Sequence, residues 1–214
     1  MKVTDVQKQK NNSERVNVFI DGEYRFSLDG LDAVIMGIKQ GKELMEQDME
    51  ECLFKSQYAK AKDKAIGMLS RKNASRKMIA DYLKEKEYDE KVADRVCDEL
   101  EELGYIDDYS YAMLFAEYAC EKLWGEKRVR YELAKNGVDS NTVEDVICAS
   151  HKITADELAD RIINKYSPID FDDIKSRQKI QRYFASRGFD YGIINSAINL
   201  CKDISAESRE NQQT

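Results

Sequence analysis

Proline is nearly absent from this chain: Pro168 is the only one in 214 residues, and glycine occurs ten times. Because these two residue types interrupt helices, their scarcity favours long helical stretches. No apolar run approaches the roughly 18 residues of a membrane-spanning helix, and the N-terminus lacks the apolar core of a signal peptide. From these absences we expect a helical, cytoplasmic protein with no membrane contact.

Cysteine occurs in a number and spacing that argue against its usual structural uses. The cysteines are odd in number, lie far apart and form no C-x-x-C pair, which argues against a disulfide framework and against a zinc site. We expect all of them to be small, buried hydrophobic side chains in a reducing compartment. They are Cys52, Cys97, Cys120, Cys148 and Cys201.

A basic excess is also missing. The 34 lysines and arginines are outnumbered by 41 aspartates and glutamates, and the formal net charge is -7. A strongly basic chain would indicate nucleic-acid binding, because neutralised phosphates dominate that affinity. The overall composition gives no such signal, although a basic patch can lie within an acidic total.

Catalytic and metal-binding constellations are absent from the sequence. It contains no P-loop, H-E-x-x-H or G-x-S-x-G motif. His151 is the only histidine, and neither it nor any cysteine has an identifiable orienting partner. The adjacent carboxylates Asp107-Asp108 and Asp172-Asp173 offer too few oxygen ligands for a hard cation. The sequence therefore predicts a protein that is not an enzyme and needs no cofactor or metal.

The first 30 residues indicate a small β-sheet. Two β-prone runs, Arg15–Ile20 and Glu23–Leu28, flank Asp21-Gly22, which is a strong signal for a hairpin with a type I′ turn. Val3–Gln9 is a candidate third strand. A lone hairpin is marginal in water, so we expect this sheet to pack on the helix that follows it.

The segment after the predicted sheet reads as helical. Leu31–Ile38 has a helical pattern that Gly41 is expected to end, and Asp48–Leu69 reads as one long helix or two. We assign residues 1–45 to an N-terminal β-hairpin extension with a short helix. Residues 46–57 form a connecting helix.

A repeated pattern occupies the rest of the chain. Residues 75–89, 125–139 and 176–190 align without gaps at offsets of about 50 residues. Each segment has two apolar side chains one helical turn apart: Ile79/Leu83, Val129/Leu133 and Ile180/Phe184. Gly137 and Gly188 then stand where a helix end needs a left-handed residue. Glu87 occupies this position in the first repeat, so the turn there is either strained or of a different kind. An N-cap for a third helix follows at Asp89, Asp139 and Asp190.

The predicted fold is therefore all-α: an elongated array of three tandem three-helix repeats, preceded by the β-hairpin or β-meander extension. The repeats are residues 58–105, 106–152 and 153–202, with an insertion at 167–173 and a disordered tail at 203–214. Beyond the aligned segments, the apolar pattern also places Leu103 and Leu114 on buried helix faces.

Basic residues recur in and beside the second helix of each repeat. They are Arg71, Lys72, Arg76 and Lys77 in the first, Lys127, Arg128 and Arg130 in the second, and Arg177, Lys179, Arg182 and Arg187 in the third. One interpretation is a stripe that faces an acidic partner or a phosphate backbone. The other is an ordinary solvated helix face.

Two further features have a functional and a structural interpretation. The segment Gly104-Tyr105-Ile106-Asp107-Asp108 is either a contact loop or, as we favour, a helix end, a packed isoleucine and an N-cap for the next helix. The aromatic side chains of Trp124 and Tyr131 either stack on nucleic-acid bases or, as we favour, pack in the core or at a helix junction.

Four motifs in order resemble the RecX family of recombinase regulators. Leu69–Arg76 resembles that family's L-x-R-R-x-x-S entry to the first repeat, and Leu100–Asp108 resembles its L-x-x-x-G-Y-L-D-D junction. Gly125–Gly137 and Lys179–Ile198 resemble its second and third repeats. One position departs from the pattern: Trp124 stands where the family often has a basic residue.

The resemblance covers residues 58–202, and the N-terminal hairpin is similar to an extension found in some members from Gram-positive bacteria. It implies a monomer that binds the RecA recombinase filament, contacts single-stranded DNA through that filament, and limits ATP hydrolysis, strand exchange and coprotease activity. Recombinational repair and the SOS response would be affected. Two alternatives from the residues stay open: a helix-turn-helix-like DNA-binding regulator built on residues 127–147, and a helical scaffold for another partner.

Overall fold

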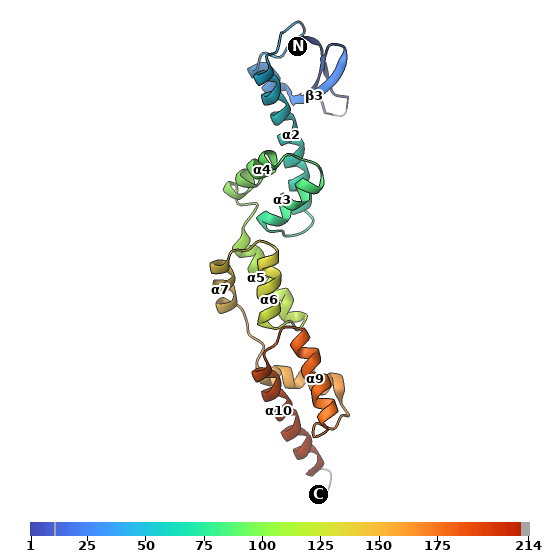
Figure 1. Cartoon of the computed structure of the whole chain (residues 1–214), viewed down its shortest axis with the longest axis vertical. Helices are drawn as coiled ribbons and strands as arrows, with labels where there is room; N and C mark the ends of the chain where they lie inside the picture. The colour runs from blue at the N-terminus through green and yellow to red at the C-terminus, as the bar shows by residue number, and fades with distance from the viewer. Residues whose placement is uncertain (11, 211–214) are drawn as a thin grey trace. The chain divides into compact units, whose positions relative to one another are not determined.

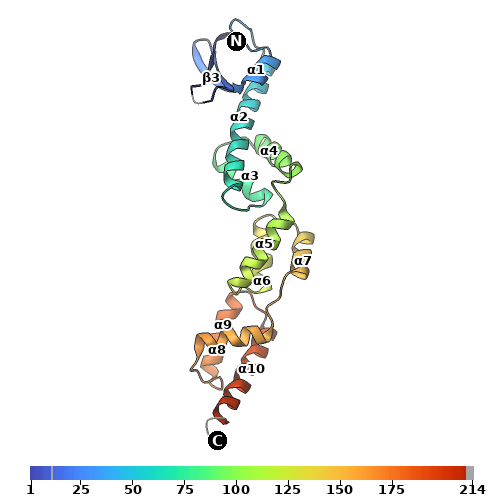
Figure 2. The same cartoon turned by 180° about the vertical axis from the view of Figure 1, so that it is seen from behind.

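The computed structural model describes residues 1–10 and 12–210. It divides into two compact units, Met1–Ile106 and Asp107–Thr214. Within the described residues, three strands are followed by ten helices, which confirms the predicted mostly helical fold with three three-helix repeats and a small N-terminal sheet (Figures 1 and 2). None of the helices in the described ranges is both long and apolar enough to cross a bilayer.

The N-terminal sheet contains the predicted hairpin and a third strand. Strands β1 (Val3–Lys8), β2 (Arg15–Ile20) and β3 (Glu23–Asp29) are antiparallel and lie in the order β1-β2-β3. Asp21 and Gly22 have φ values of 52° and 90°, as a type I′ turn requires. The local turn chemistry therefore produces the register that joins β2 to β3.

The sheet packs on one long helix, as expected. Helix α2 (Glu46–Leu69) runs without a break, so the predicted connecting helix and the first helix of the first repeat are one element (Figure 1). Its first half buries Met49 and Cys52 against the sheet residues Phe26 and Leu28, and its second half contributes to the core of the first repeat. One helix therefore serves two hydrophobic cores.

Helix α1 (Gly30–Ile35) is shorter than predicted. The expected end at Gly41 was wrong, because Gly37 adopts a φ of 62° and ends the helix earlier. The amide of Ile38 donates to the carbonyl of Ala33 at 2.7 Å, which closes a Schellman-type helix end. Ile38 is thereby turned into the core below the sheet.

The first repeat consists of the second half of α2 with α3 (Arg76–Glu85) and α4 (Glu90–Glu102). The second consists of α5 (Asp108–Glu121), α6 (Glu126–Lys135) and α7 (Ser140–Ala149). The third consists of α8 (Ala155–Tyr166), α9 (Ile174–Ser186) and α10 (Tyr191–Glu210). In all three repeats the predicted apolar pair of the second helix is buried.

Helix α10 extends further than the sequence suggested. The disordered tail predicted from residue 203 was wrong for residues 203–210, which continue the helix. No glycine or proline follows Gly192, so no residue interrupts the helical hydrogen bonds. Lys202 also pairs with Asp172 of the preceding insertion at 2.6 Å. The predicted disorder of residues 211–214 concerns positions outside the described residues.

The second helices all end with the same hydrogen bond. The amide five residues after the last core residue donates to its carbonyl, in the pairs Tyr88–Leu83, Val138–Leu133 and Phe189–Phe184. The residue before each donor has a positive φ, with values of 63° at Glu87, 85° at Gly137 and 89° at Gly188. The first repeat therefore builds the same left-handed turn without glycine.

Replacing Glu87 by glycine is expected to stabilise the protein. A left-handed backbone costs a residue with a side chain roughly 1 kcal/mol relative to glycine. Glycine also gives the unfolded chain more conformational freedom, and this offsets part of the gain. We expect a gain of about 0.5 kcal/mol in the free energy of unfolding, measured by urea titration. The matched variant Asp81→Gly, at an exposed position in the middle of α3, should lose about 1 kcal/mol instead. Destabilisation by Glu87→Gly would contradict the strain at this turn.

The Gly104–Asp108 segment has the structural role that we favoured. Gly104 has a φ of 73°, and Ile106 is 2% exposed. The carboxylate of Asp107 accepts hydrogen bonds from the amides of Tyr109 and Ser110, both at 3.0 Å, and caps α5. Its hydrogen bonds with Ser110 hold the pKa of Asp107 below its usual range. Local helix-end chemistry is therefore sufficient to explain this motif.

Four predicted packed side chains are exposed. Leu103 lies at the end of α4, where Ile106 turns back into the core in its place, and Leu114 lies away from the buried face of α5. Tyr131 points away from the core pair of α6 and is 66% exposed. Cys148 is also exposed, and Cys120 is half-buried, so the uniform burial of the cysteines was wrong.

Candidate functional site

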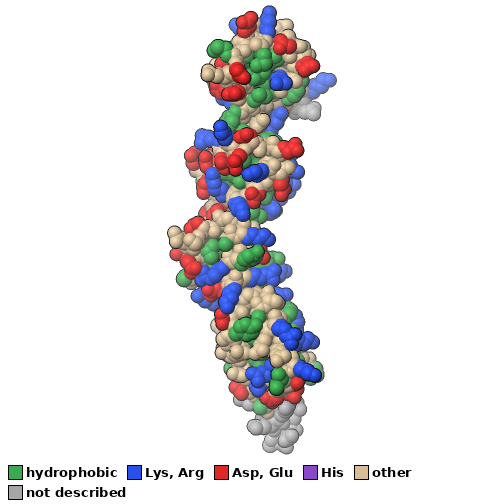
Figure 3. Space-filling model, in the orientation of Figure 1, with side chains coloured by type: hydrophobic (Ala, Val, Ile, Leu, Met, Phe, Trp, Pro, Cys, Tyr) green, Lys and Arg blue, Asp and Glu red, His purple; other side chains and the backbone are tan. Residues whose placement is uncertain are grey.

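The second helices and the residues beside them carry the predicted basic residues, and α9 has the most uniform charge of these helices. It contains four basic residues and no acidic one: Lys175, Arg177, Lys179 and Arg182. Helix α6 also has four basic residues, together with two glutamates. Lysine and arginine side chains gather over both helices on the face of the second unit shown in Figure 3. This charge makes the α6 and α9 surfaces suited to an anionic partner.

In the first repeat, the four predicted basic residues have different surroundings. Arg76 is half-buried and forms ion pairs with Asp98 at 2.7 Å and with a glutamate of α4 at 2.8 Å, so it joins α3 to α4. Arg71 and Lys72 are exposed and line an open groove of about 430 Å³ beside α3. Lys77 is exposed as well. Arg76 therefore has a structural role, and the others face solvent.

In the second repeat, Lys127 and Arg130 are held by carboxylates. Arg130 pairs with Glu126 at 2.7 Å and also with Glu144 of α7. Lys127 pairs with Asp190 at 2.7 Å, and its hydrogen bond holds the pKa of Asp190 below its usual range. Two of the three predicted basic residues in this repeat are thus engaged in fixing helices.

Trp124 is part of an aromatic cluster at the corner between α5 and α6. Its ring lies 5.9 Å from that of Phe115 and 6.0 Å from that of Tyr118, between ring centroids. The guanidinium of Arg128 stacks on the indole at 3.9 Å from its centroid. The preferred interpretation of Trp124 as a packing residue is therefore supported, because Arg128 already covers one face of the ring.

In the third repeat, Arg187 anchors the end of α9. Its guanidinium donates to the carbonyl oxygen of Lys122 at 2.5 Å and lies 5.0 Å from the ring centroid of Tyr183. The ammonium of Lys165, which the sequence reading missed, lies 3.7 Å from the same centroid. Both cations lower the pKa of Tyr183, and the hydrogen bond with Lys165 has the largest effect. Lys179 and Arg182 are exposed, whereas Arg177 is half-buried.

The second and third repeats interlock at two glycines. A Cβ on Gly125 would lie 2.3 Å from the carbonyl carbon of Gly188, and one on Gly188 would lie 2.4 Å from the amide nitrogen of Arg128. The amides of Gly125 and Lys127, at the start of α6, donate to the carbonyls of Arg187 and Gly188 at 2.8 and 3.2 Å. The turn after α9 therefore caps α6 with its own backbone.

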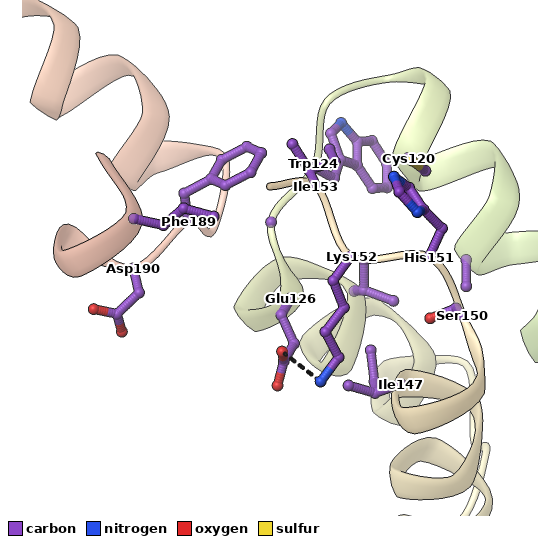
Figure 4. A pocket seen from close by; sticks show the side chains of 14 residues that line it. Cys120, Trp124, Glu126, Ile147, Ser150, His151, Lys152, Ile153, Phe189 and Asp190 are labelled. Carbon is purple, nitrogen blue, oxygen red and sulfur yellow. Dashed lines mark ion pairs between the residues drawn. The ribbon is translucent and has the colours of Figure 1, made fainter. Parts of the chain in front are cut away.

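A cavity of about 230 Å³, the junction pocket, lies beside this interlock. Its apolar walls come from both repeats: Ala116, Val129, Ile147 and Ile153 from the second repeat and its connection to α8, and Phe189 and Ile193 from the third. Figure 4 shows Trp124, His151 and Ile153 on one side of it and Phe189 on the other. The pocket exists only where the two repeats meet, so no single helical pattern indicates it.

Charged side chains surround the apolar floor of the junction pocket. Lys152 lies 3.9 Å from Glu126, a loose ion pair drawn in Figure 4, and Glu126 is held more closely by Arg130. His151 is exposed and contacts Glu157 at 3.1 Å. Among the described residues, no three His, Cys, Asp or Glu side chains form a metal-binding group. The chemistry available here is binding to an apolar group with charges at the rim.

Four family models match this chain in consecutive order. They are the regulatory protein RecX N-terminal domain at residues 1–45, and the first, second and third RecX three-helix domains at residues 61–100, 107–147 and 154–198. The matched ranges follow the N-terminal sheet and the three repeats of the structure. They account for both the helical repeats and the β-extension.

Curated relatives match over nearly the whole chain. Regulatory protein RecX of Caldanaerobacter subterraneus subsp. tengcongensis is 30% identical over 94% of this chain and 100% of its own length. Regulatory protein RecX of Clostridium botulinum is 30% identical over 92% of this chain and 94% of its own length.

Solved structures show the same fold. A crystal structure of regulatory protein RecX superposes with a TM-score of 0.68 at 22% identity, covering 92% of this chain and 98% of that chain. RecX from Lactobacillus salivarius gives a TM-score of 0.56 at 25% identity, over 68% of this chain and 96% of that one. By its full-length relatives and its four consecutive domains, this chain belongs to the RecX family of regulatory proteins.

Proposed function

We propose that this chain binds the RecA filament on single-stranded DNA and mostly inhibits it, lowering ATP hydrolysis, strand exchange and coprotease activity. The observation that carries the proposal is the match of all four RecX domains in order, with relatives named regulatory proteins. Recombinational repair and the SOS response are the processes affected, and the site of action is the cytoplasm.

The proposed mechanism is steric and electrostatic. The basic helices α6 and α9 face the acidic surface of the filament or the phosphates of its DNA, and the repeats occupy space that filament growth or the active subunit geometry requires. Arg71 and Lys72 give the first repeat a basic contact of its own. The chain acts through binding alone, so it requires no cofactor.

The test is a titration of the full chain into RecA that hydrolyses ATP on single-stranded DNA. We expect hydrolysis to fall at chain concentrations below that of RecA, with strand exchange falling in parallel. Hydrolysis and strand exchange that stay constant across the soluble concentration range would refute the proposal. Adding the chain before and after filament assembly separates an effect on growth from an effect on assembled filaments.

A second candidate, direct DNA binding without RecA, is favoured by one observation: α9 carries four basic residues and no acidic one. Such a helix suits a phosphate backbone, and the affinity would then fall steeply with salt. Fluorescence anisotropy of labelled single-stranded and duplex DNA, between 50 and 200 mM salt, tests this candidate. Binding to duplex DNA that is as tight as binding to the filament would favour it over RecA regulation.

A further inference from the structure

The junction pocket is large enough for one side chain and too small for most small-molecule ligands. Its volume is about 230 Å³, whereas ligand and cofactor sites usually span roughly 300–1,000 Å³. Its floor is built from packed core residues, because the lining residues Val129, Ile147 and Phe189 are each at most 6% exposed. A single apolar side chain from a protein partner fits this combination of size and lining.

The charges at the rim select what flanks that side chain. Asp190 pairs with Lys127 at 2.7 Å. Glu126 pairs at 2.7 Å with Arg130, which it shares with Glu144. Lys152, in contrast, has among the described residues only the loose contact of 3.9 Å with Glu126. Lys152, whose side chain is 61% exposed, is thus the rim cation whose ion pair is most easily exchanged for a partner's carboxylate. A carboxylate next to the apolar anchor would complement it.

We propose that the junction pocket is the docking site for a protein segment that presents one large apolar side chain flanked by acidic residues. The apolar side chain enters between Ile147, Ile153 and Phe189, and the carboxylate pairs with Lys152. Because the walls come from both repeats, the bound segment contacts the second and third repeats at once. The inference rests on the proposed function, which supplies the partner as the RecA filament.

Filling the pocket tests this proposal. Ala116 lines it and is 6% exposed, so Ala116→Leu places an extra apolar group inside the cavity. Filling a cavity usually maintains or raises stability, whereas losing burial of a large anchor weakens binding at least about tenfold. We expect an unchanged or higher Tm together with a dissociation constant for the RecA–DNA filament at least about tenfold above that of the parent chain.

Two further variants and a matched control make the outcome decisive. Ser150→Met fills the pocket from its rim, in case Ala116→Leu does not fold, and Lys152→Glu reverses the charge there. Ala149→Leu adds the same apolar group on the exposed side of α7 and should bind like the parent. If the folded filling variants bind the filament as tightly as the parent chain, the docking proposal for the junction pocket is refuted, while the proposed function stands. Absence of filament binding by the parent chain would overturn the proposed function, and this inference with it.

Discussion

Replacing Gly188 by alanine is expected to destabilise the second unit by at least about 3 kcal/mol. Two costs add: a left-handed backbone, with φ at 89°, disfavours any Cβ, and that Cβ would lie 2.4 Å from the amide nitrogen of Arg128. The backbone of α6 cannot move aside without breaking the hydrogen bonds that join the two repeats. Thermal unfolding followed by circular dichroism should show a Tm lower by roughly 10 °C or more.

The neighbouring glycine provides the control. Gly192 lies in α10 with only the Asp190 carboxylate near its added Cβ, at 3.8 Å. Gly192→Ala should therefore gain about 0.5–1 kcal/mol from helix propensity. Gly125→Ala should behave like Gly188→Ala, because its Cβ would meet the same turn at 2.3 Å. Equal stability of Gly188→Ala and the parent chain would show that the two repeats do not interlock as described.

Reversing three charges on α9 is expected to weaken filament binding on the order of 100-fold. Lys175, Lys179 and Arg182 are exposed, and α9 contains no acidic residue that would offset their positive charge. Glutamate at these positions replaces attraction by repulsion, and like-charge contacts cost several kcal/mol at an interface. The dissociation constant is measured with the RecA–DNA filament immobilised on a surface, at about 0.1 M salt, where the Debye length is roughly 10 Å.

The control for this variant changes net charge equally at a different place. Lys60, Lys64 and Lys91 are also exposed lysines, and all three lie in the first unit outside the predicted stripe. Their replacement by glutamate should alter the affinity by less than about threefold. Equal losses in the two triple variants would mean that net charge, and not the α9 surface, governs the interaction.

Local chemistry made much of the fold predictable. The Asp21-Gly22 turn and the left-handed glycines Gly137 and Gly188 depend on residues close in sequence, and both features are found as predicted. The end of α1 was missed because Gly37 and Gly41 are equally good stop signals within five residues. Only the packing of Ile38 into the sheet core distinguishes them.

The candidate site was less predictable because it depends on contacts between residues far apart in sequence. Gly125 stood out as a motif residue, but its reason is a backbone contact with Gly188, 63 positions away. The basic residues were identified, yet sequence could not show that Arg76, Arg130 and Arg187 bind groups within their own unit. The junction pocket has no periodic signature at all, since its walls come from separate elements.

Site-specific photo-crosslinking to the RecA–DNA filament tests the central claim most directly. A photoreactive phenylalanine replaces Tyr131 on α6, Lys179 on α9 or, for comparison, Tyr24 in the sheet, all of which are exposed. Crosslinks to RecA from positions 131 and 179 are the predicted result. Crosslinks from position 24 with none from either helix, or none from any position, would contradict the claim that α6 and α9 face the filament.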